Sequence, residues 1–138
     1  MGLYLCVFDD EENELDGLEM GTYSDYNHFL DVVTELVENS EKGSVCPTLT
    51  LHHDSDGVWE PEECKLLKSE LNVIETLFKK ALPQAFTTEW RSVIAKEIGL
   101  NPDNLYESFI DVNGDFIIGR LKELCDLAID KNCPICFQ

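Results

Sequence analysis

The spacing of apolar residues changes several times along the chain, and each change predicts a different element. Residues Gly2–Phe8 are apolar at both alternate positions, which predicts a strand buried on both faces. The next segment, Asp9–Gly21, is acidic and interrupted by glycines, so we expect a loop, with at most a short strand at Leu18–Met20. Ile135–Phe137 predicts a last short strand.

Four segments have the three-to-four-residue apolar spacing of amphipathic helices. Their expected bounds are Ser24 (as cap) to Asn39, Pro61 to Pro83, about Thr88 to Gly99, and Asp115 (as cap) onward. In the third helix the residues expected to face inward are Trp90, Val93, Ile94 and Ile98.

Two further strands and a turn complete the predicted order. Pro47–His52 and Leu105–Asp111 are strand candidates, and Asn113-Gly114 predicts a turn. The order strand, helix, strand, helix, helix, strand, helix, strand predicts one α+β or α/β layered domain over residues 1–138. We expect a small sheet of about four strands covered by about four helices.

Charge excludes several ligands. The 138 residues carry 28 acidic and 10 basic side chains, a formal net charge of −18. Residues 1–63 contain 17 of the acids and one base, Lys42. Such a surface repels phosphates, which disfavours nucleic acid and anionic membranes as partners. No apolar run approaches the roughly 18 residues of a membrane span and no export signal is visible, so we expect a cytoplasmic protein.

The six cysteines are expected to be reduced and structural. Cys6 and Cys125 lie on apolar stripes and are predicted to be small core residues. Cys133 and Cys136 have the C-x-x-C spacing, but the chain ends two residues later and offers no second ligand pair for zinc. We therefore expect no cofactor.

The segment from His52 to Glu63 is the sharpest local signal. With Gly57 at the sixth position of a calcium loop, Asp54, Asp56 and Glu63 fall at ligand positions. His52 at the first position is a poor calcium ligand, and a strand is expected where an EF-hand needs a helix. A calcium-binding module therefore remains one alternative function. An acidic adaptor that binds a basic peptide is another.

Catalysis is poorly supported, and no catalytic residue is nominated. His28 is expected to pack beside an apolar stripe, and no nucleophile, base and orienting group can be chosen from the chain. Trp59 has two interpretations. It is either a contact anchor at the tip of an acidic loop or a residue that folds back over the start of the following helix.

Several segments together resemble a known family. They are GLYLCVFDDEENELDGLEMGTYSDYNHF, PTLTLHHDSDGVWEPEECKLLKSEL, LNPDNLYESFIDVNGD and CPICFQ. Over its whole length the chain is similar to the immunity protein 70 family of bacterial polymorphic toxin systems. The resemblance implies an α+β fold and an antidote that binds a cognate toxin, without catalytic residues. At Cys133 and Cys136 the chain departs from the aliphatic residues expected there, which favours a structural role for both.

We expect the partner to be a basic toxin domain bound by an acidic face. Two acidic segments are predicted to form this face, with Trp59 as a possible anchor. The candidate residues are Asp9, Asp10, Glu11, Glu12, Glu14, Asp16, Glu19, Asp54, Asp56, Trp59 and Glu60.

Overall fold

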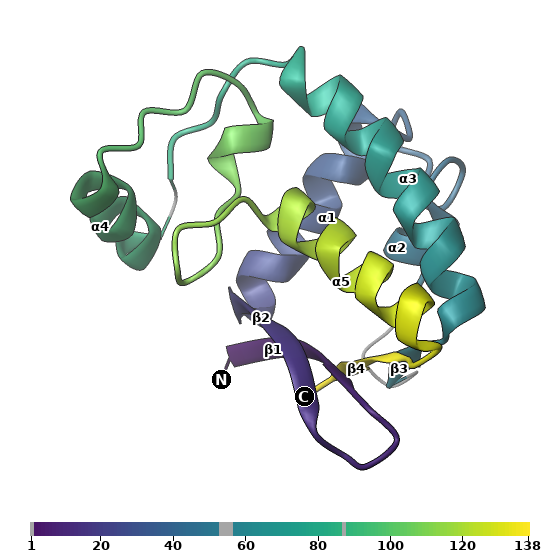
Figure 1. The fold of residues 1–138 in the computed structure, drawn as a ribbon. Coiled ribbons are helices and arrows are strands. Elements are labelled where there is room, and N and C mark those ends of the chain that lie inside the picture. Colours follow the sequence, from purple (N-terminus) through teal and green to yellow (C-terminus); the bar gives the residue numbers. More distant parts are fainter. Residues whose placement is uncertain (1, 53–56, 87) are drawn as a thin grey trace.

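Two long strands at the start of the chain form the hairpin on which the sheet is built. The computed structural model describes residues 2–52, 57–86 and 88–138 (Figure 1). Strands β1 (Gly2–Phe8) and β2 (Glu14–Thr22) pair antiparallel. Strands β4 (Ile135–Phe137) and β3 (Val58–Trp59) extend the sheet in the order β2-β1-β4-β3, with every pairing antiparallel. This order leaves β2 at one edge.

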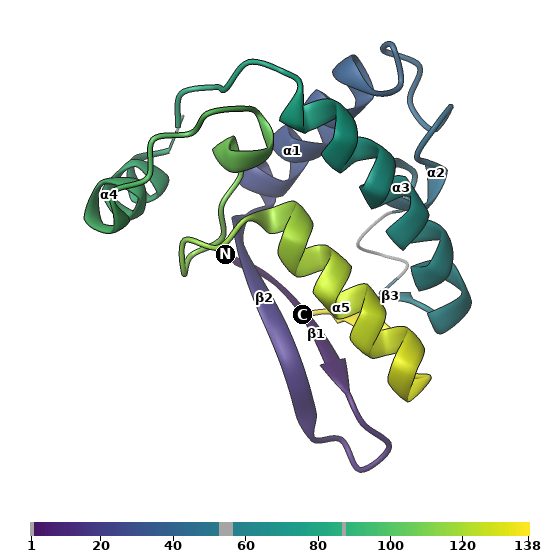
Figure 2. The same cartoon turned by 45° about the horizontal axis from the view of Figure 1, so that its top comes forward.

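The helices pack mainly on one side of this sheet. They are α1 (Tyr23–Leu36), α2 (Pro47–Thr50), α3 (Pro61–Lys79), α4 (Glu89–Ile98) and α5 (Ile117–Lys131), with a short 3-10 helix η2 (Tyr106–Ser108) before α5. Figures 1 and 2 show α3 and α5 side by side above the sheet, with α4 standing apart from the other helices. The core joins Leu3, Leu5 and Val7 of β1 to the apolar faces of α1, α3 and α5. Among the helices in the described ranges, none has the length and apolar content to cross a membrane.

The fold class and several of the elements were predicted correctly. The structure is α+β with four strands, and the predicted strands Gly2–Phe8 and Ile135–Phe137 are both present. The long helix begins at Pro61, as expected of proline in a first turn. Gly99 ends α4 in the left-handed conformation that favours glycine.

The prediction of a loop over Asp9–Gly21 is correct only for Asp9–Asn13, because strand pairing extends from Glu14 to Thr22. The possible short strand at Leu18–Met20 is part of this longer strand. Leu18 and Met20 are buried, whereas Glu14 and Glu19 are exposed. Charged residues are common on edge strands, where they discourage pairing with other chains. That use of charge made the strand look like a loop.

Both internal strand candidates are also wrong. Pro47–His52 contains one helical turn, α2, and the Glu70 carboxylate accepts the N–H groups of Thr48 at 3.2 Å and Leu49 at 3.0 Å. Leu105–Asp111 contains η2, and its Ile110 makes an isolated bridge with Phe116. Because apolar residues in short runs fit either element, their burial alone does not distinguish a strand from a helical turn.

Three helix details differ from the prediction. Thr22, not Ser24, caps α1: its Oγ1 accepts the Asp25 N–H at 3.1 Å, and the Asp25 carboxylate accepts the Thr22 N–H at 2.8 Å. Helix α5 begins after Phe116, so Asp115 does not cap it. The inward-facing set of the helix after Thr88 also needs correction. The side chains of α4 that are buried are Arg91 and Ala95, whereas Val93 and Ile98 are about half exposed.

Candidate functional site

The connection between β1 and β2 is a tight acidic turn organised by Asp9. The Asp9 Oδ1 atom accepts the N–H groups of Asn13 and Glu11, each at 2.9 Å. These two donors, with that of Asn13 first, lower the pKa of the Asp9 carboxyl. Glu12 adopts a positive φ of 64°, which lets the chain reverse. Asp10, Glu11 and Glu12 are consequently exposed at the end of the hairpin, which projects beyond the helices in Figures 1 and 2.

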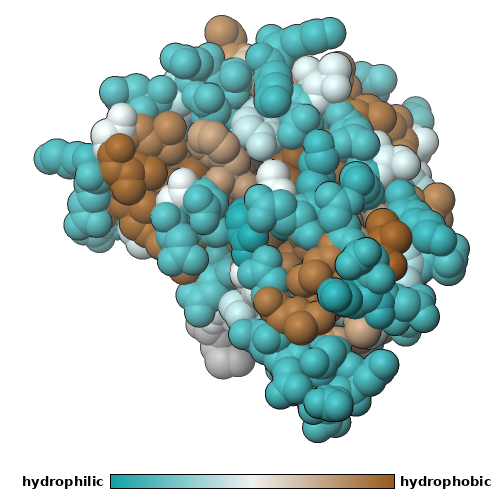
Figure 3. Space-filling view, viewed as in Figure 1, coloured by the Kyte–Doolittle hydropathy of each residue, from teal (hydrophilic) through white to brown (hydrophobic). Residues whose placement is uncertain are grey.

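Seven of the predicted contact residues lie on this one hairpin, and all of them except Asp16 form what we call the acidic hairpin. They are Asp9, Asp10, Glu11, Glu12, Glu14 and Glu19. Within the described part of the chain, none of the six makes a salt bridge with a lysine, arginine or histidine. Their negative charge is therefore not neutralised by a neighbouring base. Hydrophilic residues cover the projecting end of the hairpin in Figure 3.

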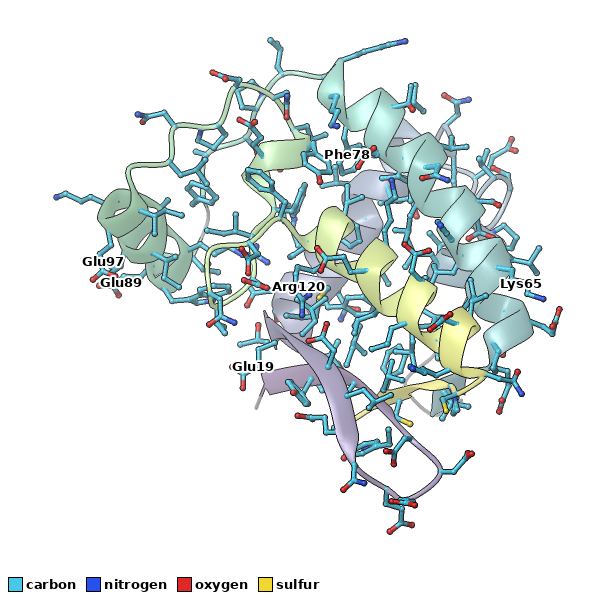
Figure 4. The ribbon with its side chains drawn as sticks, viewed as in Figure 1. Glu19, Lys65, Phe78, Glu89, Glu97 and Arg120 are labelled. Atoms are coloured by element: carbon cyan, nitrogen blue, oxygen red, sulfur yellow. The ribbon has the colours of Figure 1, made fainter. Side chains whose placement is uncertain are left out.

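Asp16 belongs to the same strand but is engaged within the fold. Its carboxylate accepts two hydrogen bonds from the Arg120 guanidinium, at 2.9 and 3.1 Å. Arg120 also donates to the Gly17 carbonyl oxygen at 2.7 Å, so it ties β2 to α5. The Arg120 hydrogen bonds lower the pKa of Asp16. Figure 4 places Arg120 between α5 and the hairpin, whereas Glu19 lies on the outside.

Trp59 is not available as a contact anchor, because it is fully buried. Its indole Nε1 donates to the Thr48 carbonyl oxygen at 3.0 Å. Its ring packs against those of His52 and Phe137, with centroids 4.6 and 4.8 Å away. The structure therefore places Trp59 in the core just before α3, which agrees with the second of its two interpretations.

The second predicted acidic segment is only partly described. Asp54 and Asp56 lie outside the described residues, and Glu60 is exposed at the start of α3. The Glu63 carboxylate, a proposed calcium ligand, accepts the Glu60 N–H at 3.0 Å instead. Among the described residues no group of three or more metal-ligating side chains is found. The calcium-binding alternative gains no support from these contacts.

The face of the sheet that points away from the core holds residues that sequence reasoning missed. Residues opposite one another in antiparallel strands share a face, so Tyr4 and Phe8 lie beside Glu19 and Glu14, respectively. Tyr4 and Phe8 are half-buried, so the predicted burial of β1 on both faces is incomplete. Burial and the adjacent Glu14 carboxylate raise the pKa of Tyr4 to about 12. Alternating apolar and polar residues along β1 would have signalled an exposed face. Because the residues at both alternate positions are apolar, the sequence did not give this signal.

Cys6, Cys125 and His28 pack within the fold, as the sequence predicted. Cys6 and Cys125 are fully buried, and all six cysteines are free thiols. Burial raises the pKa of Cys6 to about 11, so its reactive thiolate form is disfavoured at neutral pH. The His28 ring packs beside Phe109, with centroids 5.9 Å apart.

These features define an α+β protein with an acidic projecting hairpin. The chain belongs to the immunity protein 70 family, whose model matches residues 3–137. No curated protein and no solved structure matches the chain. The family match confirms the resemblance found in the sequence and places the chain among the immunity proteins.

Proposed function

We propose that this protein is an antidote that binds a cognate bacterial polymorphic toxin and neutralises it through the acidic hairpin. One observation carries the proposal. Six carboxylates gather on one hairpin, and none forms a salt bridge with a base in the described ranges. Clustered like charges repel one another and cost the folded state stability. A function that uses the charge, such as binding a basic protein surface, explains why the cluster is present.

The physical chemistry of association fits an antidote. Complementary fields raise association rates well above the roughly 10⁵–10⁶ M⁻¹s⁻¹ of neutral pairs. An immunity protein gains from such speed, because it must reach the toxin before the toxin reaches its substrate. A carboxylate-lined hairpin can also occupy a basic cleft that normally holds an anionic polymer. In this proposal the protein acts by binding in the cytoplasm and catalyses no reaction.

The contact surface that we propose is smaller than the set of residues predicted from the sequence. Asp16 and Trp59 are left out because the first is paired with Arg120 and the second is buried. Glu60 remains exposed but belongs to a different element from the acidic hairpin. Asp54 and Asp56 stay as predictions for this surface.

The test uses the purified chain and the toxin domain encoded beside its gene. The activity of that domain is measured with increasing amounts of the chain, and complex formation is followed by isothermal titration calorimetry. We expect stoichiometric inhibition and a tight complex. Binding without inhibition supports an acidic adaptor instead. If the chain neither binds nor inhibits the toxin domain, the proposal is overturned. Repeating the titration with added Ca²⁺ checks the calcium alternative. That alternative predicts that the affinity for the toxin domain depends on calcium.

A further inference from the structure

A groove lies between the acidic hairpin and α4, and the function proposed above does not use it. The groove has a volume of about 480 Å³, within the usual range of roughly 300–1,000 Å³ for ligand pockets. Tyr4, Glu19 and Gly21 line it from the hairpin, and Trp90 and Ile94 line it from α4. Segments far apart in the sequence thus form its two walls.

The α4 wall is held in place by Asp25 at the start of α1. The Asp25 carboxylate accepts the Trp90 indole N–H at 3.3 Å, besides the hydrogen bonds it accepts from Thr22. Arg91 Nη1 lies 3.8 Å from Asp25 Oδ1, and both side chains are almost completely buried. The Trp90 ring lies directly against Gly21, where an added Cβ would be 2.6 Å from the ring. The aromatic wall is therefore fixed in the free protein, and binding does not have to order it.

The chemistry of the groove indicates what it binds. Most of its lining is apolar, and Glu19 is the only charged residue among the described residues that line it. Glu19 is exposed and belongs to the acidic hairpin, so the groove and the hairpin form one continuous surface. An apolar pocket with a carboxylate at its edge fits an aromatic or long aliphatic side chain that stands beside a lysine or arginine. Exposed Val93 and Ile98 extend the apolar surface over α4, where Figure 3 shows hydrophobic residues gathered.

We propose that the toxin inserts an apolar side chain from its basic surface into this groove while its cationic residues contact Glu19 and the rest of the acidic hairpin. This inference rests on the proposed function and adds a specific anchoring site to it. Charge steers the encounter, whereas burial in a preformed pocket slows dissociation. The groove then supplies the specificity that a cluster of carboxylates lacks.

The main test variant, Gly2→Trp, fills the groove. Gly2 lies at its edge and is exposed, and an added Cβ would meet the Gly21 carbonyl oxygen at an ordinary 3.4 Å. Leu66→Trp is the matched control, because Leu66 is 59% exposed on α3, which lies on the opposite side of the molecule from α4 (Figure 1). Ile94→Ala is a second, smaller change that removes part of the wall. Thermal unfolding of all three variants shows whether each remains folded.

Affinity for the toxin domain encoded beside the gene is the readout. We expect Gly2→Trp to weaken binding at least about tenfold and Ile94→Ala to weaken it severalfold, with Leu66→Trp unchanged. Both changes should act mainly on the dissociation rate. If the wild-type chain binds and both groove variants bind equally well, the groove is not the anchoring site and the proposed function stands. If the wild-type chain does not bind, both the function and this inference are overturned.

Discussion

At the scale of single residues, Glu38 is a buried carboxylate that organises the loop between α1 and α2. It is only 1% exposed and accepts the N–H groups of Cys46 at 2.8 Å and Val45 at 3.1 Å, and the Thr50 hydroxyl at 3.3 Å. A buried charge is costly unless it is hydrogen-bonded. Burial alone would raise the pKa of Glu38, but these donors outweigh it and lower the pKa below the ordinary 4.5. Glu38 therefore stabilises the fold in its ionised form.

The substitution Glu38→Gln should lower the free energy of unfolding by about 1–3 kcal/mol at neutral pH, because the amide nitrogen cannot accept these hydrogen bonds. A carboxyl whose pKa is lowered by folding stabilises the folded state when the pH is above its pKa in the unfolded chain. The difference from wild type is thus fully present above pH 4.5 and is lost as the pH falls through the folded-state pKa. Urea unfolding at several pH values measures it. Glu41 lies exposed in the same loop, so the control substitution Glu41→Gln should change the free energy of unfolding little. Equal stability of Glu38→Gln and wild type would contradict this role.

At the scale of elements, α4 is joined to the hairpin through a close contact at Gly21. Gly21 has a φ of 103°, and an added Cβ would lie 2.6 Å from the Trp90 ring and 2.7 Å from Asp25 Oδ2. Gly99, at the other end of α4, also has a positive φ of 72° but has open space around it. Comparing the two positions therefore separates backbone strain from steric displacement of Trp90 and Asp25.

The substitution Gly21→Ala should destabilise the protein by more than the roughly 1–2 kcal/mol that a positive φ costs alanine. Gly99→Ala should show only that backbone cost. Hydrogen exchange should also become faster across α4 in Gly21→Ala, since the displaced Trp90 no longer fixes the helix. Chemical denaturation and amide exchange of both variants provide the measurements. Similar losses in the two variants would mean that the Trp90 contact does not hold α4.

The sequence predicted elements well where a long periodic pattern specified them. The helix from Pro61 is an example, because its apolar stripe spans several turns. Short segments were predicted poorly, as at Pro47–His52, where a proline and the distant Glu70 favour a helical turn. The acidic hairpin was recognised by its charge, although β2 was not. The groove was not predictable, since it depends on the packing of Trp90 against Gly21, which no local pattern encodes.

At the scale of the whole molecule, we expect the position of the negative charge to matter more for toxin binding than its amount. Reversing Asp10, Glu11 and Glu12 to lysine removes exposed charge from the acidic hairpin and leaves Asp9 to hold the turn. Reversing the exposed Asp31, Glu35 and Glu41 changes the net charge equally at another place. We expect the first variant to associate with the toxin about tenfold more slowly at low salt, with a weaker salt dependence than the second. Stopped-flow kinetics would show equal rates for the two if only net charge mattered.

The central claim, that this chain neutralises a toxin, is tested most directly by growth. Cells expressing the toxin domain encoded beside the gene are followed with and without co-expression of the chain. We predict that the wild-type chain restores growth and that the variant with Asp10, Glu11 and Glu12 reversed restores it less well. Continued growth arrest in cells that contain folded wild-type chain would contradict the account.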